Sequence, residues 1–332
     1  MSNPIVSLSI AARMTLNMHS LNNEGGEGNQ IQTRMIDIID EENTLHNVNA
    51  ISGDMLKHVL MEHLYRRAKE EHLSLCRSCQ QFNVNRINAD DQFLVDTKNL
   101  KYAEFIDQLL QHCAMDDIGG VLITAEKRSV PRKSVCEFGW VAALPQLSRT
   151  ESYFHVKYVS ERSADQRQED ADDQEKRGAN RGQNIFHRPA SSGVYALVCH
   201  LEIHRIGYND ITQSYAISDE ERQKRAALLL ESVLYTFLEL NGAMRSTQMP
   251  HLVALEGFIA TSSSATPAPL LSPLIGGSET RFAYREQAHK IAAALNGNGP
   301  ERIILHDFNS LAEFAERMRE LIDSITPQAL AL

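Results

Sequence analysis

The sequence predicts an α+β protein, in which strand-like and helix-like segments alternate along the chain. Strand-like segments show side chains alternating with a period of two, and helix-like segments show an apolar stripe with a capping residue before it. The hydrophobic fraction of 42% is enough for a substantial core. The length of 332 residues is compatible with two domains or with one domain that carries large insertions.

Residues 5–18 form the first predicted strand, because apolar and small polar side chains alternate there. Residues 22–29, NNEGGEGN, are expected to be a glycine-rich loop; they lack the lysine of a nucleotide P-loop, so a flexible turn is the default interpretation. A helix is predicted from Ser52 to about Leu73, with Ser52 as its N-cap. Its spacing places Lys57 opposite the apolar stripe, near backbone amides that favour anions, although periodicity alone also fits a solvated face.

The middle of the chain is expected to be partly helical over residues 76–120. Short strands are then predicted at Val121–Thr124, Val135–Leu144 and Tyr153–Val159. Residues 160–183 carry many charges of both signs and almost no apolar side chains, so they cannot build a core of their own. This stretch is predicted to be a long exposed loop or hairpin tip.

In the last part of the chain, strands are predicted at Val194–Ile206, Leu252–Thr261 and Arg302–His306. Helices are predicted at Ser218–Leu240, at Thr280–Leu295 and from Ser310 onward, and Ser218 and Ser310 are the expected caps of two of them. The whole pattern suits a sheet with helices on one face, and a ferredoxin-like or RRM-like core with insertions fits it.

Composition limits the function. No apolar run of about 18 residues exists, and no signal peptide is recognised, so we expect a cytoplasmic protein that does not span a membrane. Five cysteines, an odd number, favour reduced thiols. The net charge of −10 argues against a general, charge-driven DNA binder but allows a local basic track for RNA.

Motifs of catalysis are absent from the sequence, so we expect no catalytic residues, no metal, no cofactor and no enzymatic activity. Cys76 and Cys79 form a CxxC with His72 four residues earlier, but no second CxxC supplies the remaining ligands of a structural zinc. Two cysteines at a helix end is the simpler interpretation, and zinc binding by this pair stays open.

Basic residues gather in three places. They lie on the first helix, between residues 127 and 133, and on both sides of the charged loop. Lysine and arginine side chains bind phosphates without reading sequence.

Several motifs follow one another in a recognisable order, and the first two are the more specific: Ile10–Asn17 with Gly28-Asn29 and Arg34, Asn49–His58, Arg128–Ser134 with Phe138-Gly-Trp140, Gln183–Phe186 with Ser192–Ala196, and Ile206-Gly207. This order resembles the DevR-type backbone subunit of type I CRISPR surveillance complexes (Cascade), within the RAMP superfamily. Most of residues 5–260 are covered.

The resemblance implies a single domain over residues 1–332 with an RRM-like palm, a helical insertion at about 60–120 and a thumb-like hairpin at about 160–190. It also implies the partners: a CRISPR guide RNA, target DNA, further copies of the chain in a helical stack, and other Cascade subunits. Base pairing would read the target, so the protein needs only contacts with the RNA backbone.

Residue by residue, the resemblance implies guide-RNA contacts at eleven positions. They are Arg13, Asn17, Asn29, Arg34, Ser52, Lys57, Arg128, Arg132, Lys133, Gln183 and Phe186. Ser52 and Lys57 match phosphate contacts at the start of the first helix, and Phe186 would wedge against a base at the thumb.

One departure bears on activity. Related type III subunits carry an aspartate in the early loop that cleaves target RNA, whereas Gly28–Arg34 contains none and Glu24 and Glu27 do not align with it. We therefore expect a binding and scaffolding subunit. Two alternatives remain: a type III-like subunit that cleaves target RNA, and a ligand-binding α+β protein whose motif matches are accidental.

Overall fold

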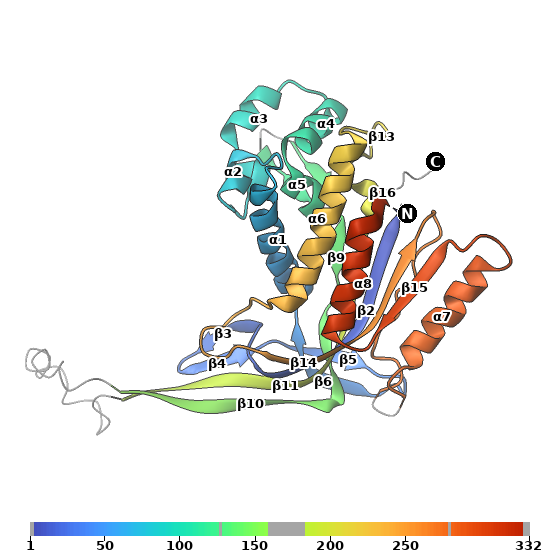
Figure 1. Cartoon of the computed structure of the whole chain (residues 1–332). Coiled ribbons are helices and arrows are strands. Elements are labelled where there is room, and N and C mark those ends of the chain that lie inside the picture. The colour runs from blue at the N-terminus through green and yellow to red at the C-terminus, as the bar shows by residue number, and fades with distance from the viewer. Residues whose placement is uncertain (1–2, 126–127, 159–182, 278–279, 328–332) are drawn as a thin grey trace, which may run out of the picture.

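A ten-stranded sheet forms the centre of the molecule in this computed structural model, which describes residues 3–125, 128–158, 183–277 and 280–327 (Figure 1). Its main path runs β15-β14-β2-β11-β10-β6-β5, and β3, β4 and β9 pair at its sides. The strands of this sheet are β2 (Ser7–His19), β3 (Asn23–Glu27), β4 (Gln30–Thr33), β5 (Met35–Ile39), β6 (Leu45–Ile51), β9 (Cys136–Phe138), β10 (Val141–Tyr158), β11 (Gln183–Leu201), β14 (His251–Ser262) and β15 (Ile303–Phe308).

Three two-stranded ladders lie outside this sheet. They join β1 (Asn3–Ile5) to β16 (Ile325–Pro327), β7 (Val121–Ile123) to β8 (Val130–Arg132), and β12 (Tyr208–Asn209) to β13 (Ser214–Tyr215).

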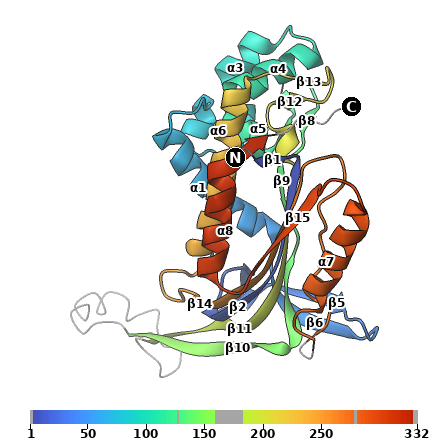
Figure 2. The same ribbon diagram turned by 45° about the vertical axis from the view of Figure 1, so that its right-hand side comes forward.

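Helices cover both faces of the sheet, and a further helical segment, α2–α5, lies beyond it. The eight α-helices of the described chain are α1 (Gly53–Glu70), α2 (Arg77–Gln80), α3 (Asp91–Thr97), α4 (Tyr102–His112), α5 (Ala114–Gly119), α6 (Asp219–Leu238), α7 (Ala283–Asn296) and α8 (Leu311–Ser324). Helices α1, α6 and α8 pack on one face of the sheet, and α7 lies on the other (Figure 2). None of the described helices is both long and apolar enough to cross a membrane.

Strand β2 is buried on both faces, which explains why one helix departs from the predicted one-sided arrangement. Leu8, Ile10 and Met14 point into the large core beneath α1, α6 and α8. Ala11, on the alternate face, packs with Phe258 and with Tyr284 of α7 in a second, smaller core. The prediction of helices on one face was therefore wrong for α7.

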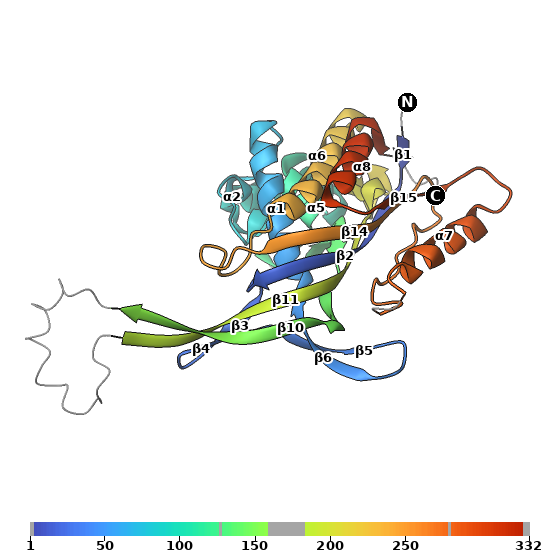
Figure 3. The ribbon, with the colours of Figure 1, turned by 60° about the horizontal axis from the view of Figure 1, so that its bottom comes forward.

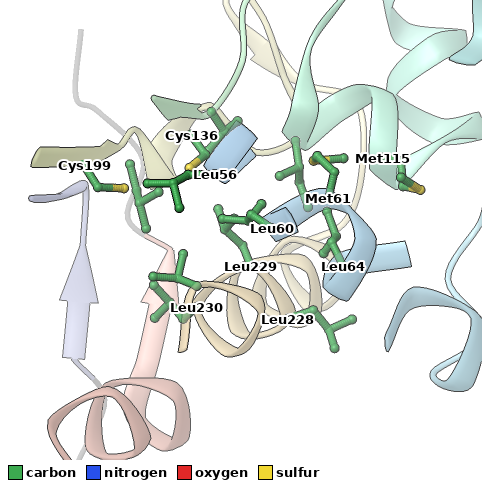
Figure 4. Close-up of a cluster of buried hydrophobic side chains, with 14 of the residues drawn as sticks. Leu56, Leu60, Met61, Leu64, Met115, Cys136, Cys199, Leu228, Leu229 and Leu230 are labelled. Atoms are coloured by element: carbon green, nitrogen blue, oxygen red, sulfur yellow. The ribbon is translucent and has the colours of Figure 1, made fainter. Parts of the chain in front are cut away.

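The large core is built where α1 and α6 meet the sheet. Leu56, Leu60 and Leu64 of α1 face Leu229 of α6, as the predicted apolar stripe required (Figure 4). Replacing one such leucine by alanine typically costs about 2–5 kcal/mol, so this contact fixes the helix firmly.

A single long strand, β10, joins most of two strands that the sequence predicted separately, Val135–Leu144 and Tyr153–Val159. Strand β10 spans Val141–Tyr158, and its partner β11 starts at Gln183, well before the expected Val194. A bulge between Ala143 and Ser148 hides this continuity from the side-chain pattern. Gly193 allows the bulge, because a Cβ there would lie 2.6 Å from the Cβ of Ser148.

The far ends of β10 and β11 project away from the helices (Figure 3). Residues 160–182 of the predicted thumb-like loop lie outside the described residues.

Two short hairpins were missing from the prediction. Strands β3 and β4 pair where a glycine-rich loop was expected, and β5 with β6 forms an edge hairpin. Exposed polar side chains dominate β3 and β4, so no apolar alternation marked them.

A helical segment, α2 to α5, is inserted between α1 and β7. Phe105, Ile106, Leu109 and Leu110 of α4 are buried, as predicted. A buried carboxylate ties this segment to the rest of the molecule: Asp117 accepts hydrogen bonds from Arg132 Nη2 at 2.6 Å, Arg225 Nη1 at 2.9 Å and the Gly207 backbone amide at 2.9 Å.

Replacing Asp117 tests the importance of this tie. Asp117→Asn leaves two buried guanidinium groups without their carboxylate, and breaking a buried ion pair on one side costs about 3–5 kcal/mol. We expect the free energy of unfolding, measured by urea denaturation, to fall by that amount. Asp219→Asn is the matched control, because Asp219 also pairs with an arginine but is exposed, and its loss should cost under about 1 kcal/mol. Equal effects of the two variants would contradict the assigned role of Asp117.

Candidate nucleic-acid interface

The start of α1 is the point where several polar segments converge. Ser52 caps the helix, as predicted, and its hydroxyl accepts a hydrogen bond from the Met55 amide at 3.2 Å. Asn22 holds this turn against the neighbouring hairpin: its Oδ1 accepts from the Ser52 amide at 2.7 Å and its carbonyl accepts from the Arg34 amide at 3.0 Å. Ser52 and Arg34 are thereby brought side by side, which the sequence did not show.

Gly53 lets the helix approach the sheet closely. A Cβ at this position would lie 2.5 Å from the carbonyl oxygen of Phe138 in β9. A larger residue would push the first turn of α1 outward and displace Ser52 and Lys57 with it.

Lys57 is half-buried and lines two adjoining cavities of about 710 and 440 Å³. Burial lowers the pKa of its ammonium group, and the nearby Arg86 lowers it further, while Asp54 and Glu137 act weakly in the opposite direction. Within the described part of the chain the ammonium has no salt-bridge partner. A bound anion would stabilise the charged form of a lysine held in this way.

Lys133 lies on the same larger cavity as Lys57 but is already paired. Its Nζ lies 2.8 Å from a carboxylate oxygen of Glu202 and 3.2 Å from one of Glu137. The hydrogen bond from Lys133 to Glu202 raises the pKa of Lys133. It can reach a phosphate only by exchanging the exposed Glu137 and the half-buried Glu202.

Arg34 forms the second positive group beside the helix start. It makes a salt bridge to Glu24 at 2.7 Å and its guanidinium lies 5.6 Å from the ring centroid of Trp140. Trp140 is 47% exposed, so one face of an indole is offered beside a cation. Such a pair can stack a nucleobase and bind its phosphate.

Three other predicted cations serve the fold instead. Arg13 is buried, and it donates to the carbonyls of Pro273 at 2.9 Å and Ile275 at 3.1 Å. Arg132 is buried against Asp117, and Arg128 donates to the Thr97 carbonyl at 2.7 Å. Because protein acceptors already bind these guanidinium groups, the three residues are not among the proposed phosphate contacts.

The remaining predicted residues lie along β2 and the β10–β11 hairpin. Asn17 is half-buried near the end of β2. Asn29 accepts a hydrogen bond at its carbonyl from the His187 amide at 2.8 Å, which places it beside Phe186. Gln183 pairs with Tyr158 at the start of β11, and its side chain lies outside the described atoms.

Several aromatic side chains that lie near the predicted Phe186 were missing from the prediction. Phe186 stacks on His155 with ring centroids 5.8 Å apart, and Phe154, which is 59% exposed, meets His187 edge to face at 5.7 Å. Tyr153 is exposed next to them. The run Tyr153-Phe154-His155 was the available signal. Because successive strand residues point to opposite faces, the pair Phe154–His187 and the pair His155–Phe186 place rings on the two faces of the hairpin, where unpaired bases can stack.

A buried cluster of potential metal ligands lies in the helical segment. Cys76 and Cys79 meet Cys113 and Asp116, and the four ligand atoms are all within 4.8 Å of one another. Cys113 and Asp116 therefore join the CxxC pair, although the sequence contains no second CxxC. His72 is not part of this cluster.

Comparison with solved structures places this fold in a known class. Two chains match over 96% of this chain and 99% of their own length, with TM-scores of 0.50 and 0.51 and 11% and 12% identity. They come from structures described as "CRISPR RNA-guided surveillance complex, pre-nicking" and "CRISPR RNA-guided surveillance complex". The likeness establishes a shared fold.

Sequence comparison gives the family. The model for "CRISPR-associated negative auto-regulator DevR/Csa2" matches residues 10–288, so the chain belongs to the DevR/Csa2 family of CRISPR-associated proteins. A curated relative, the "CRISPR-associated protein Cas7/Cst2/DevR" of Methanocaldococcus jannaschii, is 26% identical over 282 residues, covering 80% of this chain and 83% of the relative. The predicted resemblance is confirmed, and accidental motif matches are excluded.

Proposed function

We propose that this protein is a repeated backbone subunit of a type I CRISPR surveillance complex. It binds the guide-RNA backbone without reading sequence and spaces the bases for pairing with target DNA. Family membership and the fold shared with chains of RNA-guided complexes support this role. The partners are the guide RNA, the target DNA, further copies of the chain and other Cascade subunits, and the complex works in the cytoplasm.

The core of the fold is an RRM-like palm in this proposal. Along the chain β2, α1, β10, β11, α6 and β14 follow the order strand, helix, strand, strand, helix, strand, and in space the strands lie as β14-β2-β11-β10. This order supports a ferredoxin-like unit in a single domain. The segment α2–α5 is then the helical insertion, and the outer half of β10–β11 is the base of the thumb.

The observation that carries RNA binding is the placement of Lys57. It is a half-buried cation in the second turn of a helix, it lines two cavities, and it lacks a salt-bridge partner in the part of the chain that the structure describes. The amides of the first turn add partial positive charge nearby. Arg34 and Ser52 extend the polar surface toward the hairpin β3–β4, along a path that suits consecutive phosphates.

Aromatic rings on β10–β11 supply the second part of the mechanism. Phe154 and Phe186 lie on opposite faces of strands whose far ends project from the palm (Figure 3). A base that stacks on such rings gains about 1–3 kcal/mol without any sequence preference. If copies of the chain stack along the guide RNA, this contact would interrupt the stacking of its bases at constant intervals.

The subunit is non-catalytic in this proposal. Glu24 is bound to Arg34, and Glu27 accepts a hydrogen bond from Gln32 at 3.2 Å on an exposed hairpin. Among the described residues, neither carboxylate belongs to a group of three or more potential metal ligands. The alternative, a type III-like subunit that cleaves target RNA, requires one of these two groups to act on the RNA.

Lys57→Ala tests the phosphate contact. Loss of one charged hydrogen bond should weaken guide-RNA binding roughly tenfold. The slope of log K against log salt should decrease by about 0.7 for each phosphate that the protein no longer neutralises. Fluorescence anisotropy with labelled guide RNA over a salt series measures both quantities.

Lys69→Ala is the matched control for that experiment. Lys69 lies in the last turn of the same helix, is exposed and contacts Tyr65, far from the cavities. Its replacement should leave the affinity and the salt slope close to those of the unmodified protein. Equal effects of the two substitutions would rule out the placement of the guide beside Lys57.

Incubation of the RNA-loaded protein with complementary RNA and Mg²⁺ tests the non-catalytic role. We expect the target strand to remain full-length on a denaturing gel, because no carboxylate of the described hairpin β3–β4 belongs to a group of potential metal ligands. Cleavage that disappears in Glu24→Gln or Glu27→Gln would establish the type III-like alternative instead.

A further inference from the structure

Two pairs of residues with the same spacing meet inside the helical segment. Cys76 and Cys79 bracket the start of α2, and Cys113 and Asp116 bracket the start of α5. Each pair is separated by two residues, the spacing with which structural zinc sites present ligands from a tight turn. A sequence search for a second CxxC overlooks the second pair because its last member is an aspartate.

The distances suit a single small cation. Cys76 Sγ and Cys79 Sγ each lie 3.5 Å from Asp116 Oδ2. All four ligand atoms lie within 4.8 Å of one another. Ligands about 2.0–2.3 Å from a tetrahedral zinc are roughly 3.5–3.8 Å apart, so little rearrangement is needed.

The backbone around the cluster holds the ligands in place. The Cys79 amide donates to Cys76 Sγ at 3.3 Å, and the Ile87 amide donates to Asp116 Oδ1 at 3.4 Å. The second contact leaves Oδ2 directed at the thiols. Ser74 and Ala114 join the two turns through a backbone hydrogen bond of 2.9 Å.

Burial makes an empty cluster costly. Cys76, Cys79, Cys113 and Asp116 are all buried, and Asp116 is fully buried. A carboxylate removed from water needs a strong partner, and in the described part of the chain the thiols of Cys76 and Cys79 donate to its Oδ2 only weakly. A divalent cation would supply the missing charge.

We propose that Cys76, Cys79, Cys113 and Asp116 bind one structural zinc ion. Four protein ligands fill the tetrahedral shell and leave no position for water or substrate, so the role is structural. The ion would fasten α2 to the start of α5. Asp117, the next residue, holds Arg132 and Arg225, so the zinc would also steady the wall of the cavity beside Lys57.

Metal analysis of the purified protein is the direct test. The full chain is purified without added metal or chelator, and its metals are counted by mass spectrometry. We expect about one zinc per chain. Replacement by Co²⁺ should give the visible absorption of a tetrahedral thiolate site.

Matched variants assign the ligands. Cys79→Ser and Asp116→Ala should reduce the zinc content at least about tenfold, because each removes a ligand. Cys199→Ala removes a buried cysteine outside the cluster and should keep the metal. Asp116→Cys should also keep it and should shift the Co²⁺ spectrum, which separates ligand loss from a failure to fold.

Three results would overturn the proposal. A folded protein that contains no metal and takes up none after reduction would exclude the site. Full zinc retention in Cys79→Ser and Asp116→Ala would place the ion elsewhere. A disulfide between Cys76 and Cys79 in the purified protein, found by thiol alkylation and mass spectrometry, would give the pair another role.

Discussion

Asp117 receives hydrogen bonds from three parts of the chain that are distant in sequence. Arg132 comes from β8, Arg225 from α6 and the Gly207 amide from the turn after the 3-10 helix η5 (Ile203–Arg205). Because a buried carboxylate and two buried arginines are tolerated only together, the helical segment can dock in one position. That position creates the cavity that Lys57 lines, so the candidate interface depends on an ion-pair network in the interior.

Interior hydrogen bonds and ion pairs also decide which basic residues remain for a ligand. Arginines buried in the sheet or beneath the helical segment bind backbone carbonyls and carboxylates, and they are unavailable to phosphate. Lys57 lines a cavity near the N-terminus of α1, and Arg34 lies beside an exposed indole. In the proposed function, a protein with a net charge of −10 binds RNA through a small number of placed cations.

The helices and their caps could be predicted from the sequence because their signals are local. Ser52, Ser218 and Ser310 all cap helices as expected, with the side-chain oxygen accepting from an amide three residues later. The hairpin β10–β11 and the roles of Arg13 and Arg132 depend on tertiary contacts. Charge alone does not tell which face of a strand an arginine occupies. Cys113 and Asp116 join Cys76 and Cys79 only after the chain folds back on itself.

The most direct test of the central claim is nuclease footprinting of the guide RNA in an assembled particle. The chain is co-expressed with a repeat–spacer RNA and its neighbouring genes, and the particle is isolated by size exclusion with absorbance read at 260 and 280 nm. We predict a large particle with RNA of fixed length, protected at a constant interval set by one copy of the chain. A monomer that carries no RNA, or RNA digested evenly along its length, would contradict the account.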